Sequence, residues 1–280
     1  MIKILIICGQ TATGKTKLAA KLAKKFHSEL ISADSRQVFR GMDIVTGKDR
    51  PHGVKIYGLD LVNPDEDFSV AHFVKYSRTL INQIRFPIIV GGTGLYLDSL
   101  INPPETLTVK PNWPLRKKLE TFSVRQLQKL LKQLNSERLK TMNHSDQLNP
   151  RRLIRAIEVA KSLQGPSLQV EKYDTLWIGL TADKKILDQK ISDRVRQRLK
   201  AGAIQEWQKL TAKYNWNLPS MSGLGYAQLP DVTAWIKAEQ QYSRRQLTWF
   251  HKNKAIHWFD ITNKNLFKEV ANQVNSWYTK

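Results

Sequence analysis

Residues 9–16 read Gly9-Gln10-Thr11-Ala12-Thr13-Gly14-Lys15-Thr16. An apolar run over residues 2–8 precedes them, and a helical pattern over residues 15–26 follows. A strand, a glycine-rich loop and a helix in this order, with the spacing G-x-x-x-x-G-K-T, are typical of a phosphate-binding loop. Backbone N–H groups of such a loop turn toward phosphate oxygens, and the helix N-terminus adds partial positive charge. Lys15 supplies a full charge, and the Thr16 hydroxyl suits Mg²⁺. The stretch therefore predicts a phosphorylated ligand, ATP or another nucleotide included, but not which one.

The rest of the first hundred residues alternates between strand and helix patterns. Short strands are expected over residues 29–32, 55–59 and 86–90, and Ser69 is suited to cap a helix. This alternation predicts a parallel sheet with helices on both faces. Ligands of such sheets bind at the carboxyl ends of the strands. Asp34 and Thr93 follow two of these ends, so we expect them to converge on the phosphate loop. A turn-forming role is the alternative for each.

The α/β pattern returns in the last third of the chain. A strand is expected over residues 175–180, and the helix after it carries Arg194. A loop follows over residues 218–226, then a helix over 242–251, a strand over 255–260 and a closing helix. The predicted fold class is therefore α/β, a parallel sheet of the phosphate-loop NTPase type flanked by helices, with a mostly helical basic insertion. We expect residues 1–104 and 170–280 to form the core and residues 105–169 the insertion.

The expected insertion is basic and helical. Prolines at positions 103, 104, 111 and 114 mark its start, and helices are expected over residues 115–134, 136–142 and 151–163. Thirteen Lys and Arg stand against four Asp and Glu between residues 110 and 161. Arg151, Arg152 and Arg155 fall in the first turns of a helix, where the helix dipole disfavours cations. This placement predicts an anionic partner for them.

Composition points to a polyanionic partner. The chain has 280 residues, with 45 Lys and Arg against 24 Asp and Glu, which gives a formal net charge of +21 at pH 7. Such an excess favours nucleic acid, and a basic surface kept for solubility is the alternative. No apolar run reaches the length of a membrane span, and we recognise no signal peptide. The single cysteine, Cys8, rules out a disulfide within the chain, so we expect a reducing cytoplasmic location.

The expected acidic partner of an ATPase is missing. Many phosphate-loop ATPases end a second apolar strand with a carboxylate that holds magnesium. Here the strand over residues 86–90 ends in Gly-Gly-Thr, which does not favour ATP hydrolysis. Asp34 is the acid best placed near the loop, as a magnesium ligand or as a general base. Two other classes of protein stay open: a small-molecule phosphotransferase of the nucleoside-kinase type, and an RNA-binding nucleotide switch.

Several motifs, taken together, resemble one family, the tRNA dimethylallyltransferases, also called tRNA isopentenyltransferases. The matching stretches are in the same order along nearly the whole chain: residues 9–16, 31–44, 68–73, 91–97, 152–159, 223–226 and 245–250. The phosphate loop is shared by many families. The stretch Asp34-Ser35-Arg36-Gln37-Val38 together with Gly91-Gly92-Thr93-Gly94-Leu95-Tyr96 is much more specific.

The resemblance implies a reaction. A dimethylallyl group moves from dimethylallyl diphosphate to the N6 amine of the adenosine at position 37 of tRNA, 3′ of the anticodon, and diphosphate leaves. In that reaction the phosphate loop, Gly9 to Thr16, grips the diphosphate of the prenyl donor. Asp34 would be the general base, while Lys15, Arg194 and Thr16 with Mg²⁺ would stabilise the leaving group, and Thr93 would lie beside them.

The resemblance also implies how the RNA is held. The target adenine leaves the anticodon-loop stack, and residues of the specific motifs contact it and its neighbours. The implied tRNA-binding residues are Asp34, Ser35, Arg36, Gln37, Thr93, Arg116, Arg151, Arg152, Leu153, Ile154, Arg155, Gly225, Tyr226, Arg244, Arg245, Gln246 and Trp249. Several positions depart from the family pattern: Gln10 stands for Pro, Phe39 for Tyr and Arg196 for Asp, and residues 45–49 replace a Gly-Thr-Ala-Lys-Pro pattern. We expect a monomer with no membrane partner.

Overall fold

The computed structural model describes residues 1–162 and 171–279. The chain divides into two compact units, Met1–Asn102 with Glu171–Lys280 and the intervening Pro103–Val170. The expected end of the insertion, at residue 169, lies outside the described residues.

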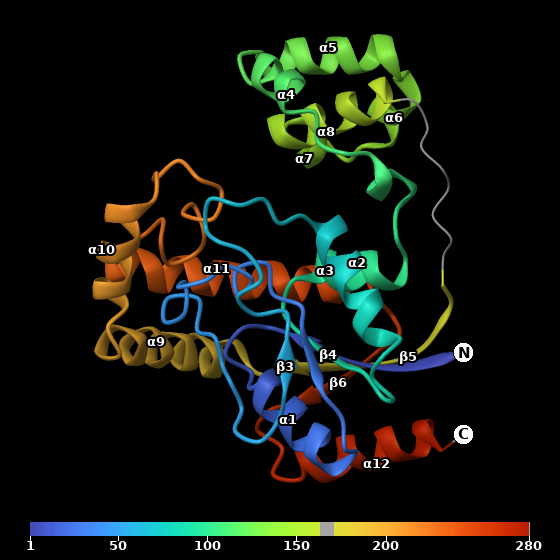
Figure 1. Ribbon diagram of the computed structural model, residues 1–280, viewed down its shortest axis with the longest axis vertical. Helices are drawn as coiled ribbons and strands as arrows, with labels where there is room; N and C mark the ends of the chain where they lie inside the picture. The colour runs from blue at the N-terminus through green and yellow to red at the C-terminus, as the bar shows by residue number, and fades with distance from the viewer. Residues whose placement is uncertain (163–170, 280) are drawn as a thin grey trace. The chain divides into compact units, whose positions relative to one another are not determined.

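The first unit is built on a sheet of six parallel strands (Figure 1). Their order across the sheet is β3-β2-β4-β1-β5-β6, and the longest pairing, between β1 and β5, runs over eight residues. The bounds are β1 Ile2–Gly9, β2 Leu30–Ser32, β3 Ile56–Tyr57, β4 Ile88–Val90, β5 Tyr173–Thr181 and β6 Ile256–Asp260. The predicted α/β class with a phosphate-loop-like parallel sheet is confirmed.

Helices cover both faces of this sheet. Figure 1 shows α1 and α12 on one side, and α2, α3 and α11 on the other with α9 and α10 beside α11. The bounds are α1 Lys15–Lys25, α2 Val70–Ile81, α3 Gly94–Ile101, α9 Lys184–Lys200, α10 Ala203–Lys213, α11 Val232–Phe250 and α12 Leu266–Tyr278. Parallel strands are joined by crossovers, which is why helices cover both faces.

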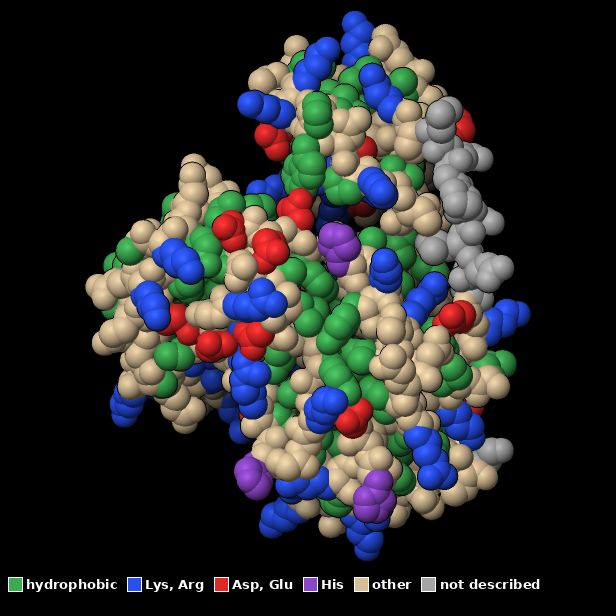
Figure 2. Space-filling model, viewed as in Figure 1, with side chains coloured by type: hydrophobic (Ala, Val, Ile, Leu, Met, Phe, Trp, Pro, Cys, Tyr) green, Lys and Arg blue, Asp and Glu red, His purple; other side chains and the backbone are tan. Residues whose placement is uncertain are grey.

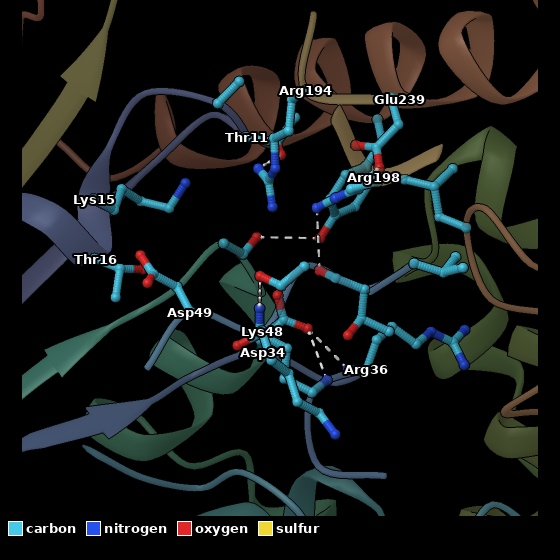
Figure 3. Close-up of a pocket in the computed structure, with 18 of the residues that line it drawn as sticks. Thr11, Lys15, Thr16, Asp34, Arg36, Lys48, Asp49, Arg194, Arg198 and Glu239 are labelled. Carbon is cyan, nitrogen blue, oxygen red and sulfur yellow. Dashed lines mark hydrogen bonds and ion pairs between the residues drawn. The ribbon is translucent and has the colours of Figure 1, made fainter. Parts of the chain in front are cut away.

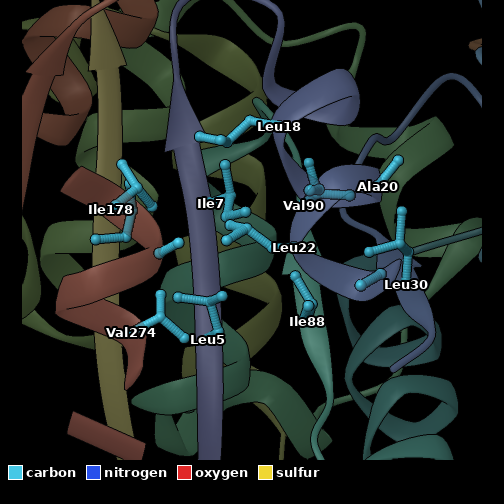
Figure 4. Close-up of a cluster of buried hydrophobic side chains, with 14 of the residues drawn as sticks. Leu5, Ile7, Leu18, Ala20, Leu22, Leu30, Ile88, Val90, Ile178 and Val274 are labelled. Atoms are coloured by element: carbon cyan, nitrogen blue, oxygen red, sulfur yellow. The ribbon is translucent and has the colours of Figure 1, made fainter. Parts of the chain in front are cut away.

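The main core lies between the sheet and the α1–α12 layer. Alternate residues of β1, Leu5 and Ile7, point into it with Leu22 of α1 and Val274 of α12 (Figure 4). All four are fully buried, and the burial of their apolar surface fixes the position of α1 on the sheet. The phosphate loop, which joins β1 to α1, is thereby held between two buried elements.

A second apolar cluster supports the loops beyond the sheet. It gathers Met42 and Val45 of the segment after β2, Val195 of α9, Tyr226 of the 218–226 loop and Trp235 of α11. All are at most 1% exposed. The connection after β2, which carries Asp34 to Lys48, is therefore anchored by packing although it has almost no regular structure.

The second unit consists of short helices in the part that the structure describes. They are η1 Glu105–Thr108, α4 Trp113–Leu119, α5 Val124–Leu134, α6 Ser136–Thr141, α7 His144–Gln147 and α8 Pro150–Lys161. The single helix expected over residues 115–134 is wrong: it is two helices. Ser123 begins α5 with a capping box to Gln126, and this local cap competes with continuation of α4. Leu127, Leu131, Leu153 and Ile157 form the unit's core.

Among the described residues, no helix has the length and the apolar character needed to cross a bilayer.

Candidate active site

The phosphate loop is shaped by positive φ angles at three positions. They are Gly9 (125°), Ala12 (62°) and Gly14 (79°), and Gly14 stands directly before α1. A Cβ atom on Gly9 would collide with the backbone of Leu180 in β5, so only glycine fits at the end of β1. The loop therefore turns sharply from the sheet into the helix N-terminus, the geometry of an anion cradle.

Lys15 lies inside this loop. Its Nζ donates a hydrogen bond to the carbonyl oxygen of Gln10 at 2.6 Å, and Thr13 Oγ1 donates to the same oxygen at 2.7 Å. Burial and the nearby charge of Arg194 lower the pKa of Lys15 to about 8, while Asp34 opposes that change. A bound anion would favour the charged form and raise the pKa again.

Asp34 stands at the end of β2. Its Oδ1 accepts hydrogen bonds from the backbone N–H of Arg36 at 2.8 Å and of Gln37 at 3.3 Å. This carboxylate thus closes a turn, as the alternative interpretation proposed, but those bonds use only one of its two oxygens. Its charge acts on both Lys15 and Arg194. Turn formation and a role as a base are compatible here, because the turn fixes the carboxylate in one orientation.

Thr93 is brought next to Asp34 by the pairing of β2 with β4. Its backbone N–H donates to the carbonyl of Ala33 at 3.2 Å, and its Oγ1 accepts from the N–H of Ser35 at 3.1 Å. Gly91 makes this approach possible, because a Cβ atom there would collide with Ala33. The convergence of the two strand ends follows from parallel pairing.

Helix α11 closes the site behind these loops. Gln246, 5% exposed, accepts from the N–H of Thr11 at 2.8 Å and donates to the carbonyl of Gly92 at 3.0 Å. Trp249 packs against Gly94 and donates from Nε1 to Asp98 at 2.6 Å. Both glycines leave room for these side chains, since a Cβ atom on either would collide with them. Tyr242 also contacts Thr93, and burial raises the pKa of its phenol.

Two arginines of α9, one turn apart, face the same region. Arg194 donates to Thr11 Oγ1 at 2.9 Å, while Arg198 pairs with Glu239 of α11 at 2.9 Å (Figure 3). Burial and Arg198 lower the pKa of Arg194 to about 10, so it stays charged near neutral pH. Gly47 fits beneath both guanidinium groups, where a Cβ atom would meet them. The result is a fixed cationic wall beside the phosphate loop.

The segment after β2 is held by a carboxylate of α10. Glu206 accepts hydrogen bonds from three consecutive backbone N–H groups, those of Asp43 (2.9 Å), Ile44 (2.6 Å) and Val45 (3.0 Å). The hydroxyl of Tyr226 donates to the same carboxylate, and burial raises the pKa of that phenol. These contacts position the wall that carries Gly47.

These elements enclose one cavity of about 1310 Å³. Figure 3 shows Lys15, Asp34 and Arg194 directed toward it from three different elements. Its wall includes many of the residues that we expect to act in catalysis or ligand binding, namely Thr11, Gly14, Lys15, Thr16, Asp34, Ser35, Arg36, Gln37, Arg194, Arg245 and Gln246. Thr93 reaches the same region through Ser35 and Tyr242.

Other residues expected to bind tRNA are placed differently. Tyr226 is 0% exposed, Leu153 0% and Ile154 7%, so each packs in a core. Gly225 has a φ of 89° and packs against Val45 and Trp235. In the structure these residues support loops and helices, and their contact with RNA stays a prediction. Arg244, by contrast, is exposed on α11.

The arginines of the second unit have local partners. Glu158, only 3% exposed, receives two hydrogen bonds from Arg116 at 2.8–2.9 Å and one from Arg155 at 2.5 Å. Although burial raises it, these bonds and one from the Asn112 N–H lower the pKa of Glu158 to about 2. Arg152 pairs with Asp146. The anionic partner expected for this cluster is therefore internal, and among the described residues Arg151 is the exposed member without an ion pair.

Sequence reasoning missed Arg198, Glu239, Glu206 and Ser243. Arg198 follows Arg194 by four residues, a spacing that places both on one helix face. Its partner Glu239 is 41 residues away in the sequence, and no local pattern connects the two. Glu206 likewise acts on a segment more than 160 residues earlier.

The fold and the cavity define a class of protein. A phosphate loop faces a fixed carboxylate and a cationic wall at the carboxyl ends of a parallel sheet, which suits transfer of a group from a phosphorylated donor.

Comparison with known proteins narrows this class. The model of the IPP transferase family matches residues 37–253, and that of isopentenyl transferases matches residues 2–65. A tRNA dimethylallyltransferase from Microcystis aeruginosa is 34% identical over 97% of this chain and 92% of its own length. The crystal structure of the tRNA isopentenylpyrophosphate transferase of Bacillus halodurans aligns with 99% of this chain and 97% of its own, at 31% identity and a TM-score of 0.75. The corresponding Staphylococcus epidermidis structure aligns with 99% of both chains, at 30% identity and 0.72.

The chain belongs to the IPP transferase family. A eukaryotic dimethylallyltransferase acting on tRNA shares the fold, with a TM-score of 0.82 at 23% identity over 98% of this chain and 78% of that one.

Proposed function

We propose that this protein transfers a dimethylallyl group from dimethylallyl diphosphate to the N6 amine of adenosine 37 in tRNA, releasing diphosphate. The observation that carries the proposal is the shared cavity, in which Asp34 lies opposite Lys15 and Arg194. Family membership supplies the reaction class. In the reaction the amine nitrogen forms a bond to C1 of the dimethylallyl group, and the bond from C1 to the diphosphate oxygen breaks.

Asp34 takes the proton that the amine loses. An exocyclic amine is a weak nucleophile, so a positioned base contributes to the rate. The turn bonds at Oδ1 leave the other carboxylate oxygen to meet the amine. Thr93 lies beside it through Ser35, where its hydroxyl can orient the acceptor or the donor.

The departing diphosphate gains negative charge, and the loop residues meet that charge. Backbone N–H groups at the start of α1, Lys15 and Arg194 surround the cradle. They are fixed before the reaction by buried contacts, so little reorganisation accompanies charge development.

Magnesium is the cofactor that we propose for this step. The described residues contain no cluster of three acidic, His or Cys ligands, so a protein-only cage for a metal is not built there. The residues nevertheless fit Mg²⁺, which is commonly held by a few protein oxygens together with substrate phosphates and water. The Thr16 hydroxyl and the Asp49 carboxylate line the cavity wall and would hold it. When bound, the ion would neutralise part of the diphosphate charge.

The net charge of +21 supports an RNA acceptor. Lys and Arg are spread over the visible face of both units in Figure 2. Arg36, Arg244, Arg245 and Arg151 are the arginines that we propose to contact tRNA. We also propose a cytoplasmic location. In addition we propose that the enzyme is a monomer, and light scattering with and without tRNA would test its oligomeric state.

The test is an incubation with an anticodon stem-loop that carries A36-A37-A38, Mg²⁺ and either dimethylallyl diphosphate or ATP. We expect the RNA to gain one C₅H₈ unit on A37 by mass spectrometry, with one diphosphate released for each transfer, and no ATP turnover. Unmodified RNA together with ATP hydrolysis or phosphorylation of a small molecule would favour a kinase instead. ATP or GTP binding with neither product would favour an RNA-binding switch.

A further inference from the structure

The side chain of Gln10 is buried between two elements that flank the phosphate loop. It is 5% exposed and directly follows β1. Its Nε2 donates to Ser243 Oγ in α11 at 3.0 Å, and its Oε1 accepts from Thr181 Oγ1 at the end of β5 at 2.9 Å. Ser243 is itself 3% exposed. A buried amide with both ends hydrogen-bonded is held in one position, since breaking either bond leaves an unpaired polar group.

The backbone of the same residue supports the functional lysine. The Gln10 carbonyl oxygen accepts from Lys15 Nζ at 2.6 Å and from Thr13 Oγ1 at 2.7 Å. The position of Gln10 therefore sets where the ammonium group rests and how the loop between Gln10 and Lys15 is folded.

Helix α11 holds the next residue of the loop in a similar way. Gln246 is three residues after Ser243, which places both on one face of α11. Its side chain joins the N–H of Thr11 to the carbonyl of Gly92, the residue before Thr93. Through these two contacts α11 sets the distance between the phosphate loop and the segment that carries Thr93.

We propose that Gln10 is a positioning residue that docks the phosphate loop on α11 and β5 and thereby holds Lys15 in register for the diphosphate. The inference rests on the proposed function for the identity of the ligand. It deepens that function, because it assigns to Gln10, Ser243 and Thr181 a role in diphosphate affinity although none of them is expected to touch the prenyl acceptor.

The experiment measures binding of inorganic diphosphate with Mg²⁺ by calorimetry, which needs no prenyl transfer. Gln10→Leu removes both side-chain bonds at similar volume, while Ser243→Ala and Thr181→Val each remove one bond with little change in packing. We expect Gln10→Leu to raise the Kd for diphosphate by about tenfold and each single-bond variant by a few-fold. The double variant Gln10→Leu/Ser243→Ala should match Gln10→Leu, since the bond is already lost. Gln208→Leu on the exposed side of α10 is the matched control.

A readout for positioning distinguishes this role from general destabilisation. We expect Kd for the RNA stem-loop and the midpoint of thermal unfolding to stay near wild type in Ser243→Ala and Thr181→Val, while diphosphate affinity falls. Unchanged diphosphate affinity in all three variants would overturn the proposal, as would parallel losses of RNA and diphosphate binding. If the wild-type protein binds diphosphate but transfers no prenyl group, the proposed function fails, and the role of Gln10 is still decided by the same Kd values.

Discussion

Lys15 shows how a single functional residue is tuned by its surroundings. Burial and the charge of Arg194 lower the pKa of Lys15, while the charge of Asp34 partly offsets the effect. The ammonium is therefore poised to gain from an incoming anion. In the free protein the buried, charged ammonium lowers the free energy of unfolding at pH values below the folded-state pKa of about 8. Stability should rise between about pH 8 and 10.5, because there only the unfolded chain binds the proton.

The pH dependence of diphosphate binding should reflect the titration of Lys15. Above about pH 8 the free protein loses the Lys15 proton, so the Kd should rise by up to about tenfold per pH unit. Calorimetry between pH 7 and 9.5 measures this, with Lys15→Met as the reference that removes the titrating group. Curves for the two proteins that differ only by a constant factor would show that Lys15 does not titrate in this range.

Elements are held in this chain by carboxylates that bind several donors at once. Glu206 of α10 fixes three N–H groups of the segment after β2, and Glu158 of α8 joins α4 to α8 through Arg116. Each carboxylate accepts several hydrogen bonds at once and thereby ties its donor segments together. Segments with little regular structure thereby acquire fixed positions.

The second unit should lose stability when Glu158 is neutralised. Glu158→Gln leaves two arginines without their ion pair, and we expect a loss of about 3 kcal/mol, read by hydrogen exchange in α4, α5 and α8. In the wild type the contribution should be present above pH 4.5 and disappear as pH falls toward about 2, because the folded-state pKa is depressed. Glu137→Gln, which removes an exposed pair with Lys140, is the control and should change stability by less than about 0.5 kcal/mol. Equal effects of the two variants would contradict this assignment.

At the scale of the molecule, the sequence predicts the sheet and the loop well and the walls of the site poorly. The motif at residues 9–16 predicts its own conformation because glycine, lysine and threonine act locally. Asp34 and Thr93 converge as expected, since parallel strands end at one edge. The contacts that Gln246, Trp249 and Tyr226 make in the structure are not predicted by any local pattern. Their partners lie on distant segments, and such pairs are decided only by tertiary packing.

The net charge of +21 predicts salt-dependent binding of tRNA. The logarithm of the association constant should fall linearly with the logarithm of salt concentration, as counterions leave the RNA. Arg151→Ala removes an exposed arginine without an ion pair in the described structure, and it should reduce that slope by about one. Filter binding from low to moderate salt measures the slope. Lys268→Ala, on α12, is the control and should leave the slope unchanged.

We propose that Asp34 and the phosphate loop act on the two substrates within one cavity. Single-turnover transfer to the stem-loop by wild type and Asp34→Asn, with Kd for diphosphate and for RNA measured beside it, tests this most directly. Asn keeps an oxygen that can accept the two turn bonds but is no base at neutral pH. We predict a rate lower by about 10²–10⁴-fold, with both Kd values within a few-fold of wild type. A variant that keeps the wild-type rate would contradict the account.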